Sequence, residues 1–281
     1  MKVAIVGSNG QLGSDLVRVF SEKHEVVTLN HADIKVEDTD SVNTVLLAIK
    51  PAVVINTSAY HNVPLCEQNP DLSFAVNGKG VLNLSKVCND INARLVHYST
   101  DYVFDGNKKQ PYVETDLCNP LNVYGVTKLA GENLVLNYAN QPYVIRVSGI
   151  YGKVPCRAKG GNFITTMLKL AKEKPEVKVV DDEILTPTPT SAIAENTLAL
   201  INKDAYGLYH MTCEGQCSWY EFAKTIWEVL QLKTPLYPTT VSAFSSPVKR
   251  PFYSVLENQK LKQLGINQMP DWKDGLINYL K

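Results

Sequence analysis

The chain has 281 residues, of which 28 are basic and 28 acidic, so its formal net charge is zero. This balance argues against binding to nucleic acid or to an anionic membrane, and we expect neither partner. The apolar run at the N-terminus is too short for a signal peptide or a membrane span, and the six cysteines are scattered. We therefore expect a cytoplasmic protein with reduced thiols.

The first predicted element is a short apolar strand, residues 2–6, which runs into a glycine-rich turn and then an amphipathic helix. Gly7, Gly10 and Gly13 have the spacing Gly-x-x-Gly-x-x-Gly. Glycines at this place permit a tight turn and let backbone amides approach a pyrophosphate at the positive end of a helix. The segment predicts a dinucleotide site, with a plain glycine turn as the alternative.

The second predicted strand, residues 25–29, ends in Asn30 and His31. Dinucleotide folds often place an acidic residue here for the ribose 2′-hydroxyl of NAD, or an arginine nearby for the 2′-phosphate of NADP. Neither residue type follows the strand directly, and Asp33 is a possible ribose ligand. NADPH, NADH and the use of both therefore stay open.

Strands and helices alternate through the rest of the first half. Helices are predicted at 39–50, 70–91 and 122–138, and strands at 52–55, 94–98 and 143–147. This order predicts an α/β protein with a doubly wound parallel sheet, that is, a Rossmann fold. Ligands of such sheets bind beyond the carboxyl ends of the strands, so the residues that follow these strands should share one crevice.

The pattern changes after Ser148. A basic loop at 149–161 precedes predicted helices at 162–173, 190–201, 218–230 and 272–280 and strands at 177–180 and 207–210. We expect residues 1–148 to form the dinucleotide-binding domain, with a returning helix near 190–203. Residues 149–281 should form mainly a smaller, mixed α/β substrate-binding lobe.

The segment 97–128 predicts catalytic chemistry. Thr100 lies at the end of a predicted strand, and Tyr124 and Lys128 lie four residues apart, on one face of the next helix. An ammonium group beside a phenol would lower the phenol pKa from about 10 toward the working range. With the Thr100 hydroxyl on the same substrate oxygen, the three side chains predict proton transfer at a carbonyl or alcohol.

The Tyr-x-x-x-Lys pattern is weak evidence when it stands alone, because Tyr220 and Lys224 also match it. That second pair lies in an amphipathic helix without a hydroxyl-bearing strand end before it, and we interpret it as structural. Tyr124 differs in its position, since its helix follows the strand that ends in Thr100 and should border the crevice of the glycine turn.

Together these motifs resemble the dTDP-4-dehydrorhamnose reductase family of the extended short-chain dehydrogenase/reductases. The similarity rests on the glycine turn and on the segments 97–104 and 120–132, with shorter supporting matches at 161–163, 187–188, 207–210 and 250–251. It implies NAD(P)H-dependent reduction of the C4 keto group of a nucleotide-linked 4-keto-6-deoxy sugar. The expected reaction converts dTDP-4-dehydrorhamnose to dTDP-L-rhamnose, a precursor of cell-surface polysaccharide.

The resemblance also implies roles for individual residues. Thr100, Tyr124 and Lys128 correspond to the catalytic triad. With the turn glycines and the residues after the second strand, the expected cofactor-binding residues are Gly7, Gly10, Gln11, Leu12, Gly13, Asn30, His31, Ala59, Tyr60, His61 and Tyr98. Asp101, Tyr102 and Arg250 are expected to contact the substrate, with Arg250 at its diphosphate; a surface salt bridge is the alternative for Arg250.

Two departures from the family pattern affect specificity. Family members usually carry a tryptophan, expected to pack on the sugar ring, where this chain has Gly149, so the identity of the sugar stays open. Asn30 stands in place of the usual aspartate, which leaves the choice between NADH and NADPH open.

No metal site is expected from the sequence. Some members of the family bind magnesium, and Asp15 corresponds in position to such a ligand, but a carboxylate on a helix face is usually only solvated. His210, Cys213 and Cys217 lack the paired spacing and the fourth ligand of a zinc site.

Three other functions stay open beside this one. They are a reductase for a different nucleotide 4-keto sugar, a non-catalytic regulatory subunit resembling that of methionine adenosyltransferase, and an epimerase or dehydratase of the same fold. Intact Thr100, Tyr124 and Lys128 argue against the regulatory subunit, and the absence of an acidic pair after Thr100 argues against a dehydratase. A nucleotide sugar is the expected partner, and a homodimer is a possible assembly.

Overall fold

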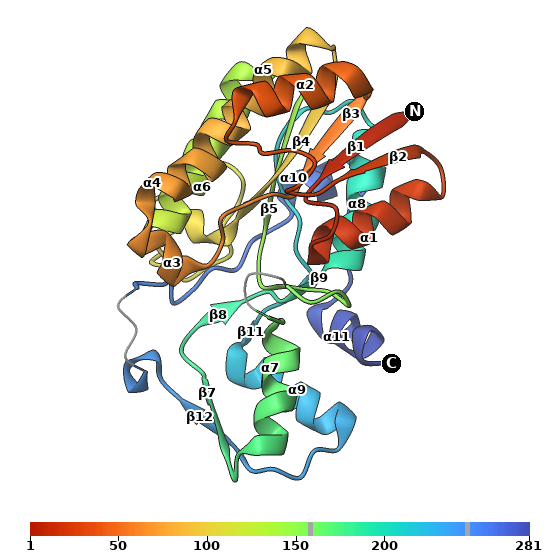
Figure 1. The fold of residues 1–281 in the computed structure, drawn as a ribbon. Coiled ribbons are helices and arrows are strands. Elements are labelled where there is room, and N and C mark those ends of the chain that lie inside the picture. Colours follow the sequence, from red (N-terminus) through yellow and green to blue (C-terminus); the bar gives the residue numbers. More distant parts are fainter. Residues whose placement is uncertain (157–159, 245–247) are drawn as a thin grey trace.

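A six-stranded parallel sheet forms the centre of the molecule in a computed structural model that describes residues 1–156, 160–244 and 248–281 (Figure 1). The strands lie in the order β10-β5-β4-β3-β1-β2. They are β1 (Lys2–Val6), β2 (Glu25–Leu29), β3 (Val53–Asn56), β4 (Arg94–Thr100), β5 (Pro142–Val147) and β10 (Gly207–His210). This arrangement confirms the α/β fold class.

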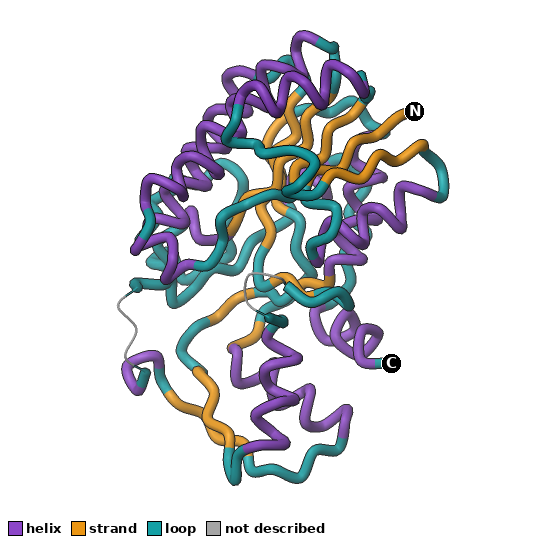
Figure 2. Tube along the Cα trace, in the orientation of Figure 1, coloured by secondary structure: helices purple, strands orange, loops and turns teal. Residues whose placement is uncertain are grey.

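Helices cover both faces of the sheet (Figures 1 and 2). One face carries α1 (Gln11–Ser21) and α8 (Thr190–Ile201), and the other carries α2 (Thr39–Ile49), α5 (Gly80–Asp90) and α6 (Val123–Tyr138). Successive residues of a strand point to opposite faces. In β1, Val3 and Ile5 accordingly enter the core with α1, whereas Ala4 and Val6 enter the core with α2 and α5.

The last strand of the sheet comes from the second half of the chain. β10 pairs in parallel with β5, from Gly207 opposite Tyr143 to His210 opposite Arg146. α8 packs closely on α1, so it also lies against the sheet. The sheet therefore includes chain from beyond residue 148, and the division into two domains at that residue stays a prediction.

The segment 63–90 is not the single helix from Pro70 to Ile91 that the sequence suggested. It forms α3 (Val63–Gln68), α4 (Pro70–Phe74), a π-helical turn (Ala75–Lys79) and then α5. The turn places the side chain of Asn77 inside, where it donates to the carbonyl of Tyr60 at 2.9 Å and to the hydroxyl of Thr127 at 3.1 Å. Such π-helical turns often occur at functional sites.

A smaller lobe packs below the carboxyl ends of the strands (Figure 1). It contains α7 (Phe163–Glu173), α9 (Trp219–Leu230) and the strand pairs β7 (Val177–Val180) with β12 (Leu236–Thr239) and β8 (Ile184–Leu185) with β11 (Cys217–Ser218). β6 (Ile150–Tyr151) pairs with β9 (Thr188–Pro189), and α11 (Trp272–Leu280) packs on α9. Residues 157–159 of the predicted basic loop lie outside the described residues.

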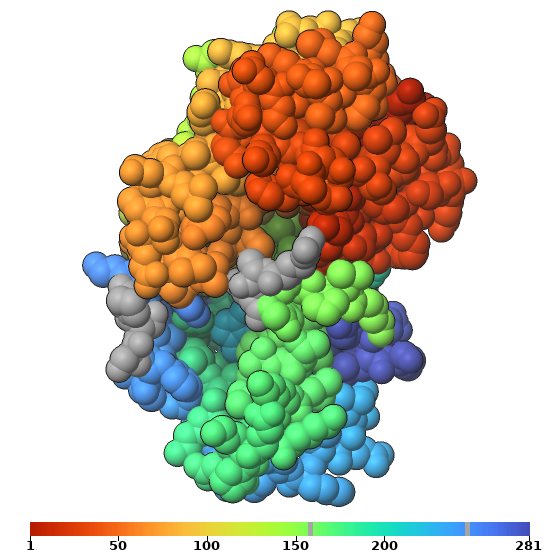
Figure 3. All heavy atoms as spheres, viewed as in Figure 1, coloured from red at the N-terminus to blue at the C-terminus, as the bar shows by residue number. Residues whose placement is uncertain are grey.

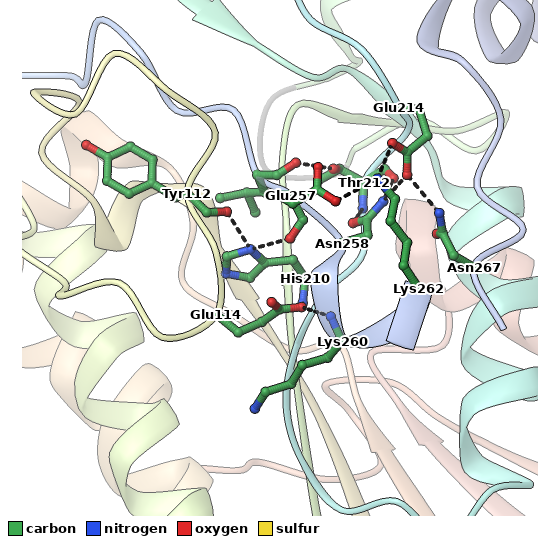
Figure 4. Close-up of polar contacts among 11 residues, drawn as sticks. Tyr112, Glu114, His210, Thr212, Glu214, Glu257, Asn258, Lys260, Lys262 and Asn267 are labelled. Atoms are coloured by element: carbon green, nitrogen blue, oxygen red, sulfur yellow. Dashed lines mark hydrogen bonds and ion pairs between the residues drawn. The ribbon is translucent and has the colours of Figure 1, made fainter. Parts of the chain in front are cut away.

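The C-terminal segment returns to the sheet through a polar network around β10 (Figure 4). Glu114 accepts hydrogen bonds from the backbone N–H groups of His210 and of Lys260, the latter in α10 (Gln259–Gln263). Glu214 accepts from the amide of Asn258 at 3.0 Å and forms an ion pair with Lys262 at 2.8 Å. These bonds hold the segment before α10 in place, and that segment brings Ser254 to the cleft described below.

A buried ion pair links α6 to β5. Arg146 and Glu132 are almost fully buried, and two guanidinium nitrogens of Arg146 donate to the two carboxylate oxygens of Glu132 at 2.9 and 2.7 Å. Such a bidentate pair fixes the position of a helix strongly, because removal of either partner leaves a buried charge without compensation. The pair therefore fixes the distance between α6, which carries Tyr124 and Lys128, and the sheet.

We expect Glu132→Ala to lower the free energy of unfolding by about 3–5 kcal/mol, because it leaves the guanidinium of Arg146 buried without its partner. Chemical denaturation monitored by circular dichroism measures the change. Glu25→Ala is the matched control: it removes an exposed ion pair with Lys2 and should change stability by no more than about 1 kcal/mol. Equal effects of the two substitutions would contradict a stabilising role for the buried pair.

Candidate active site

A cleft of about 910 Å³ lies between the sheet and the lobe. Figure 3 shows the hollow where the upper and lower parts of the molecule meet. Its sheet side is lined by the glycine turn, by the ends of β3 and β4 and by the start of α6, and its lobe side by α7, β7, β8 and α9. The cleft therefore lies at the carboxyl ends of the strands, where the sequence places the ligand.

The glycine turn has the geometry of a phosphate-binding cradle. Gly7 has φ +80°, and a Cβ atom on Gly13 would lie 2.2 Å from the carbonyl oxygen of Gly7, so glycine is required at both positions. Gly10 precedes α1 without a side-chain cap, and the first turn of α1 has no acidic residue. The positive N-terminus of α1 thus lies at the cleft, which suits the diphosphate of a dinucleotide.

Tyr124 is held beside Thr100 by the way α6 begins. The side chain of Asn122 accepts the backbone N–H of Gly125 at 2.9 Å and so caps the helix. A Cβ atom on Gly125 would lie 2.2 Å from the carbonyl oxygen of Tyr102, so the first turn of α6 is pressed against the chain that leaves β4. Glycine at this position lets Tyr124 approach the strand end.

The hydroxyl of Thr100 is oriented by Asp101. Thr100 Oγ1 donates to one carboxylate oxygen of Asp101 at 3.0 Å, and Ser148 and Ser254 donate to the other at 2.9 and 2.6 Å. Burial raises the pKa of Asp101, whereas these three hydroxyls lower it. Both carboxylate oxygens thus have partners inside the protein, so Asp101 orients the hydroxyls around the site.

Lys128 lies at the bottom of the cleft and is only 2% exposed. Its Nζ donates to the carbonyl oxygen of Tyr98 at 2.6 Å and lies 3.2 Å from Nε2 of His97. Burial lowers the pKa of Lys128 to about 8, and the nearby Glu132 opposes this shift. The lysine is therefore close to the point at which it loses its charge.

The pKa of Tyr124 differs from the sequence expectation. Burial raises this pKa above its ordinary value, and the hydrogen bond with Thr100 opposes the rise only in part. The expected lowering by Lys128 is absent because the lysine is bonded to the backbone of β4 and is itself desolvated. Tyr124 is thus protonated across the neutral range, which is the form that a proton donor needs.

Most of the predicted site residues line the cleft together. The predicted residues on its walls are Gly10, Gln11, Leu12, Gly13, Ala59, His61, Tyr98, Thr100, Asp101, Tyr102, Tyr124, Lys128 and Arg250. Gly7, Asn30, His31 and Tyr60 are not among the residues that line the cleft. The backbone N–H of Tyr60 donates to Asn77 instead. Asn30 closes a local turn in which its side chain accepts from Ala32, and His31 beside it is exposed. The ligand roles of all these residues stay predictions.

The two Tyr-x-x-x-Lys pairs lie in different surroundings. Tyr220 packs against the apolar core of the lobe, and Lys224 is exposed. Lys128 is buried, Tyr124 is partly buried, and both line the cleft. Position after the strand that ends in Thr100, and not the motif itself, therefore distinguishes the pair in the cleft.

The lobe adds cleft residues that the sequence did not reveal. Phe163 and Trp219 stack with their ring centroids 4.5 Å apart, and the buried Glu183 lies near Arg250, whose charge opposes the rise in the Glu183 pKa caused by burial. The Nε atom of Arg250 is itself buried and has no hydrogen-bond partner among the described residues. Phe163 and Arg250 fall in the short family matches at 161–163 and 250–251, whereas no short motif marks Glu183 or Trp219.

Comparison with known proteins identifies the family. Residues 1–281 match the family described as the RmlD substrate binding domain. A spore coat polysaccharide biosynthesis protein of Bacillus subtilis is 37% identical over 100% of this chain and 97% of its own length. A dTDP-4-dehydrorhamnose reductase of Burkholderia thailandensis is 36% identical over 97% of this chain and 96% of its own. The crystal structure of dTDP-4-dehydrorhamnose reductase from Bacillus anthracis in complex with NADP has a TM-score of 0.95 and 34% identity, with 99% of this chain and 98% of that chain covered.

The chain belongs to the dTDP-4-dehydrorhamnose reductase family. Membership confirms the family resemblance and the expectation of an NAD(P)-dependent oxidoreductase that uses a nicotinamide cofactor. It also supports the reduction of a keto group on a nucleotide sugar as the type of reaction. No helix in the described part of the chain is long and apolar enough to cross a membrane.

The structure also places the residues considered as metal ligands. Asp15 accepts a hydrogen bond from the hydroxyl of Thr190 at 2.6 Å and forms an ion pair with Arg18 at 3.3 Å. Both partners belong to the protein, and they give Asp15 a role in joining α1 to α8. Within the described ranges, no group of three histidine, cysteine, aspartate or glutamate residues is arranged to hold a metal ion.

We expect Gly13→Ala to weaken the binding of nicotinamide dinucleotides and to lower stability by about 1–3 kcal/mol, because its Cβ would overlap the carbonyl oxygen of Gly7. Fluorescence titration with NADPH and thermal unfolding measure the two effects. Gly78→Ala is the control, since a Cβ there would meet Phe74 at an ordinary 3.9 Å. Unchanged NADPH affinity in Gly13→Ala would count against the cradle.

Proposed function

We propose that this reductase converts dTDP-4-dehydrorhamnose to dTDP-L-rhamnose, with NADPH or NADH as reductant. The observation that carries the proposal is the convergence of Thr100, Tyr124 and Lys128 on one cleft that continues to the glycine turn. The names of the relative from Burkholderia thailandensis and of the structure from Bacillus anthracis support the substrate, and the NADP in that structure supports the cofactor.

The glycine turn and the N-terminus of α1 would hold the diphosphate of the cofactor. The cofactor supplies a hydride to the keto carbon when it is bound. His61, whose ring lies 3.1 Å from the carbonyl of Ala59, and the first turn of α1 line the same cleft as Tyr124. The cleft thereby aligns the cofactor-binding turn with the proton donor, and the alignment of reacting groups is a large part of catalysis.

Tyr124 donates the proton to the keto oxygen in this proposal. Its raised pKa keeps it protonated until the oxygen develops charge. Thr100 donates a hydrogen bond to Asp101 and also hydrogen-bonds Tyr124, so it orients the phenol toward the cleft. To bond the substrate oxygen as well, Thr100 would have to turn its proton away from Asp101, and we therefore assign it first to the orientation of Tyr124.

The lobe side of the cleft would bind the nucleotide part of the substrate. Arg250 has a buried, unpartnered Nε and suits a diphosphate. The stacked rings of Phe163 and Trp219 offer an apolar surface of the kind on which a base or a sugar ring packs.

A reductase for a different nucleotide 4-keto sugar is the second candidate, and Gly149 is the observation that favours it. Gly149 lines the cleft with φ +51°, and a Cβ there would lie 2.9 Å from the side chain of Leu185. The backbone at this position thus disfavours any side chain, including the tryptophan expected to pack on the sugar in other members. The surface offered to the sugar ring differs accordingly.

A panel of nucleotide-linked 4-keto sugars, tested with NADPH and NADH separately, distinguishes these candidates. We expect loss of absorbance of the reduced nicotinamide with dTDP-4-dehydrorhamnose, and the highest kcat/KM on that substrate. Higher kcat/KM on another 4-keto sugar would favour the second candidate. Turnover of none of them, together with recovery of a stoichiometric synthetase partner from cell extract, would favour a regulatory subunit.

We expect Tyr124→Phe to lower kcat at least about 100-fold, because it removes the proton donor and leaves the ring in place. Steady-state kinetics give kcat, and a fluorescence titration gives the affinity for NADPH, which should be nearly unchanged. Tyr220→Phe in the lobe is the matched control and should retain normal turnover. Normal turnover by Tyr124→Phe would disprove the role assigned to this tyrosine.

A further inference from the structure

A chain of buried polar contacts leads from the end of β3 to Lys128. The side chains of Asn56, His97 and Lys128 follow one another from the end of β3 to the helix α6, and all three are buried. His97 lies between the other two, with Nδ1 3.1 Å from Nδ2 of Asn56 and Nε2 3.2 Å from Nζ of Lys128.

The orientation of Asn56 is set by Ser58. The backbone N–H of Ser58 donates to Oδ1 of Asn56 at 3.0 Å, and the hydroxyl of Ser58 lies 2.6 Å from the same atom. A backbone N–H is only a donor, so the atom it contacts is the carbonyl oxygen of the amide. The other end of the Asn56 side chain, which faces His97, is therefore its NH₂ group.

This orientation selects one tautomer of His97. An NH₂ group can only donate, so Nδ1 of His97 must accept and carries no proton. Burial lowers the pKa of His97 well below its ordinary value, so the ring is neutral. A neutral imidazole with a bare Nδ1 carries its proton on Nε2, the atom that faces Lys128.

The Nε2–H of His97 then points at the nitrogen of Lys128. An ammonium group has three donors and no acceptor, so a charged Lys128 could not accept a hydrogen bond from this N–H. A neutral amine has one lone pair, which can accept from His97 while an N–H of the amine donates to the carbonyl of Tyr98 at 2.6 Å. Only the amine satisfies every group in the chain.

We propose that the cofactor-free enzyme holds Lys128 as a neutral amine through the Nε2–H of His97, and that Lys128 takes up a proton from solvent when a nicotinamide dinucleotide fills the cleft. The second part rests on the proposed function. The dinucleotide brings a negatively charged diphosphate and ribose hydroxyls, which favour a nearby ammonium over a neutral amine.

The charged and titratable groups around Lys128 are consistent with a neutral amine in the cofactor-free enzyme. Burial lowers the pKa of Lys128 to about 8. A hydrogen bond donated by His97 to the neutral amine lowers this pKa further. Glu132, one turn along α6, favours the ammonium, but its carboxylate is already paired with Arg146 of β5. On the other side, Tyr124 is protonated, and Asp101 faces it through Thr100.

The proposed change of charge has a consequence for the reaction. A neutral Lys128 does not stabilise the phenolate, so the empty enzyme keeps its proton on Tyr124. The ammonium that forms in the filled cleft stabilises the phenolate left after Tyr124 has donated its proton. Charge would thus appear beside Tyr124 only when the cleft is occupied.

The tautomer can be tested without any ligand. In enzyme labelled with ¹⁵N-histidine, NMR distinguishes protonated from unprotonated ring nitrogens, and the signals absent from His97→Asn identify His97. We expect a bare Nδ1 and a protonated Nε2 in the free enzyme near neutral pH. A proton on Nδ1 with a bare Nε2, or protons on both, would overturn the proposal.

Calorimetry tests the proton uptake. At about pH 8.5, in buffers of different ionisation enthalpy, the binding of NADPH should take up close to one proton, and its 2′-phosphate is already ionised at that pH. Binding without uptake would overturn the inference about Lys128 and leave the proposed function intact. Failure to bind NADPH or NADH at all would contradict the proposed function itself.

Two substitutions connect the proton to this hydrogen-bond chain. Asn56→Asp provides an acceptor for Nδ1–H of His97, which leaves Nε2 bare to accept a hydrogen bond from the ammonium of Lys128. Lys128 should then be charged before NADPH binds, and proton uptake on binding should fall to near zero. Lys128→Met should abolish the uptake at ligand concentrations that still saturate the protein. Undiminished uptake in Lys128→Met would overturn the assignment to this lysine even if the Asn56 variant failed to fold.

Discussion

The hydrogen bond from Lys128 to the carbonyl of Tyr98 holds the active site together, because it joins α6 to β4 at the depth of the sheet. The lysine side chain reaches this depth only because the helix comes unusually close. A Cβ atom on Gly131 would lie 2.4 Å from the carbonyl oxygen of Asn77, and one on Gly125 would lie 2.2 Å from that of Tyr102. The two glycines let α6 settle against its neighbours, and the ion pair between Glu132 and Arg146 keeps it there.

The sequence predicts the central architecture well because its signals there are local. Apolar strands alternate with amphipathic helices, and the spacing of Gly7, Gly10 and Gly13 marks the phosphate cradle without reference to the rest of the chain. Contacts between distant segments carry no such mark. The sequence does not reveal that β10 completes the sheet, that Asn77 lies in a π-helical turn, or that Ser254 reaches Asp101 from far along the chain.

Electrostatics in the site depend on burial, which a motif does not encode. The spacing of Tyr124 and Lys128 indicates a charged lysine that lowers the pKa of the tyrosine. In the structure desolvation dominates, so the pKa of Tyr124 rises and that of Lys128 falls. A phenol that keeps its proton and a lysine close to neutrality suit an enzyme that must donate a proton only after its cleft is filled.

Transfer of deuterium tests the central claim most directly. The enzyme would be supplied with dTDP-4-dehydrorhamnose and NADPH deuterated at the transferable position of the nicotinamide, and the product would be examined by NMR and mass spectrometry. If the cofactor and the proton donor share this cleft, we expect one deuterium per product, located at C4 of the sugar, and one oxidised nicotinamide per product. A product without deuterium at C4, or a sugar changed without net oxidation of NADPH, would contradict the account.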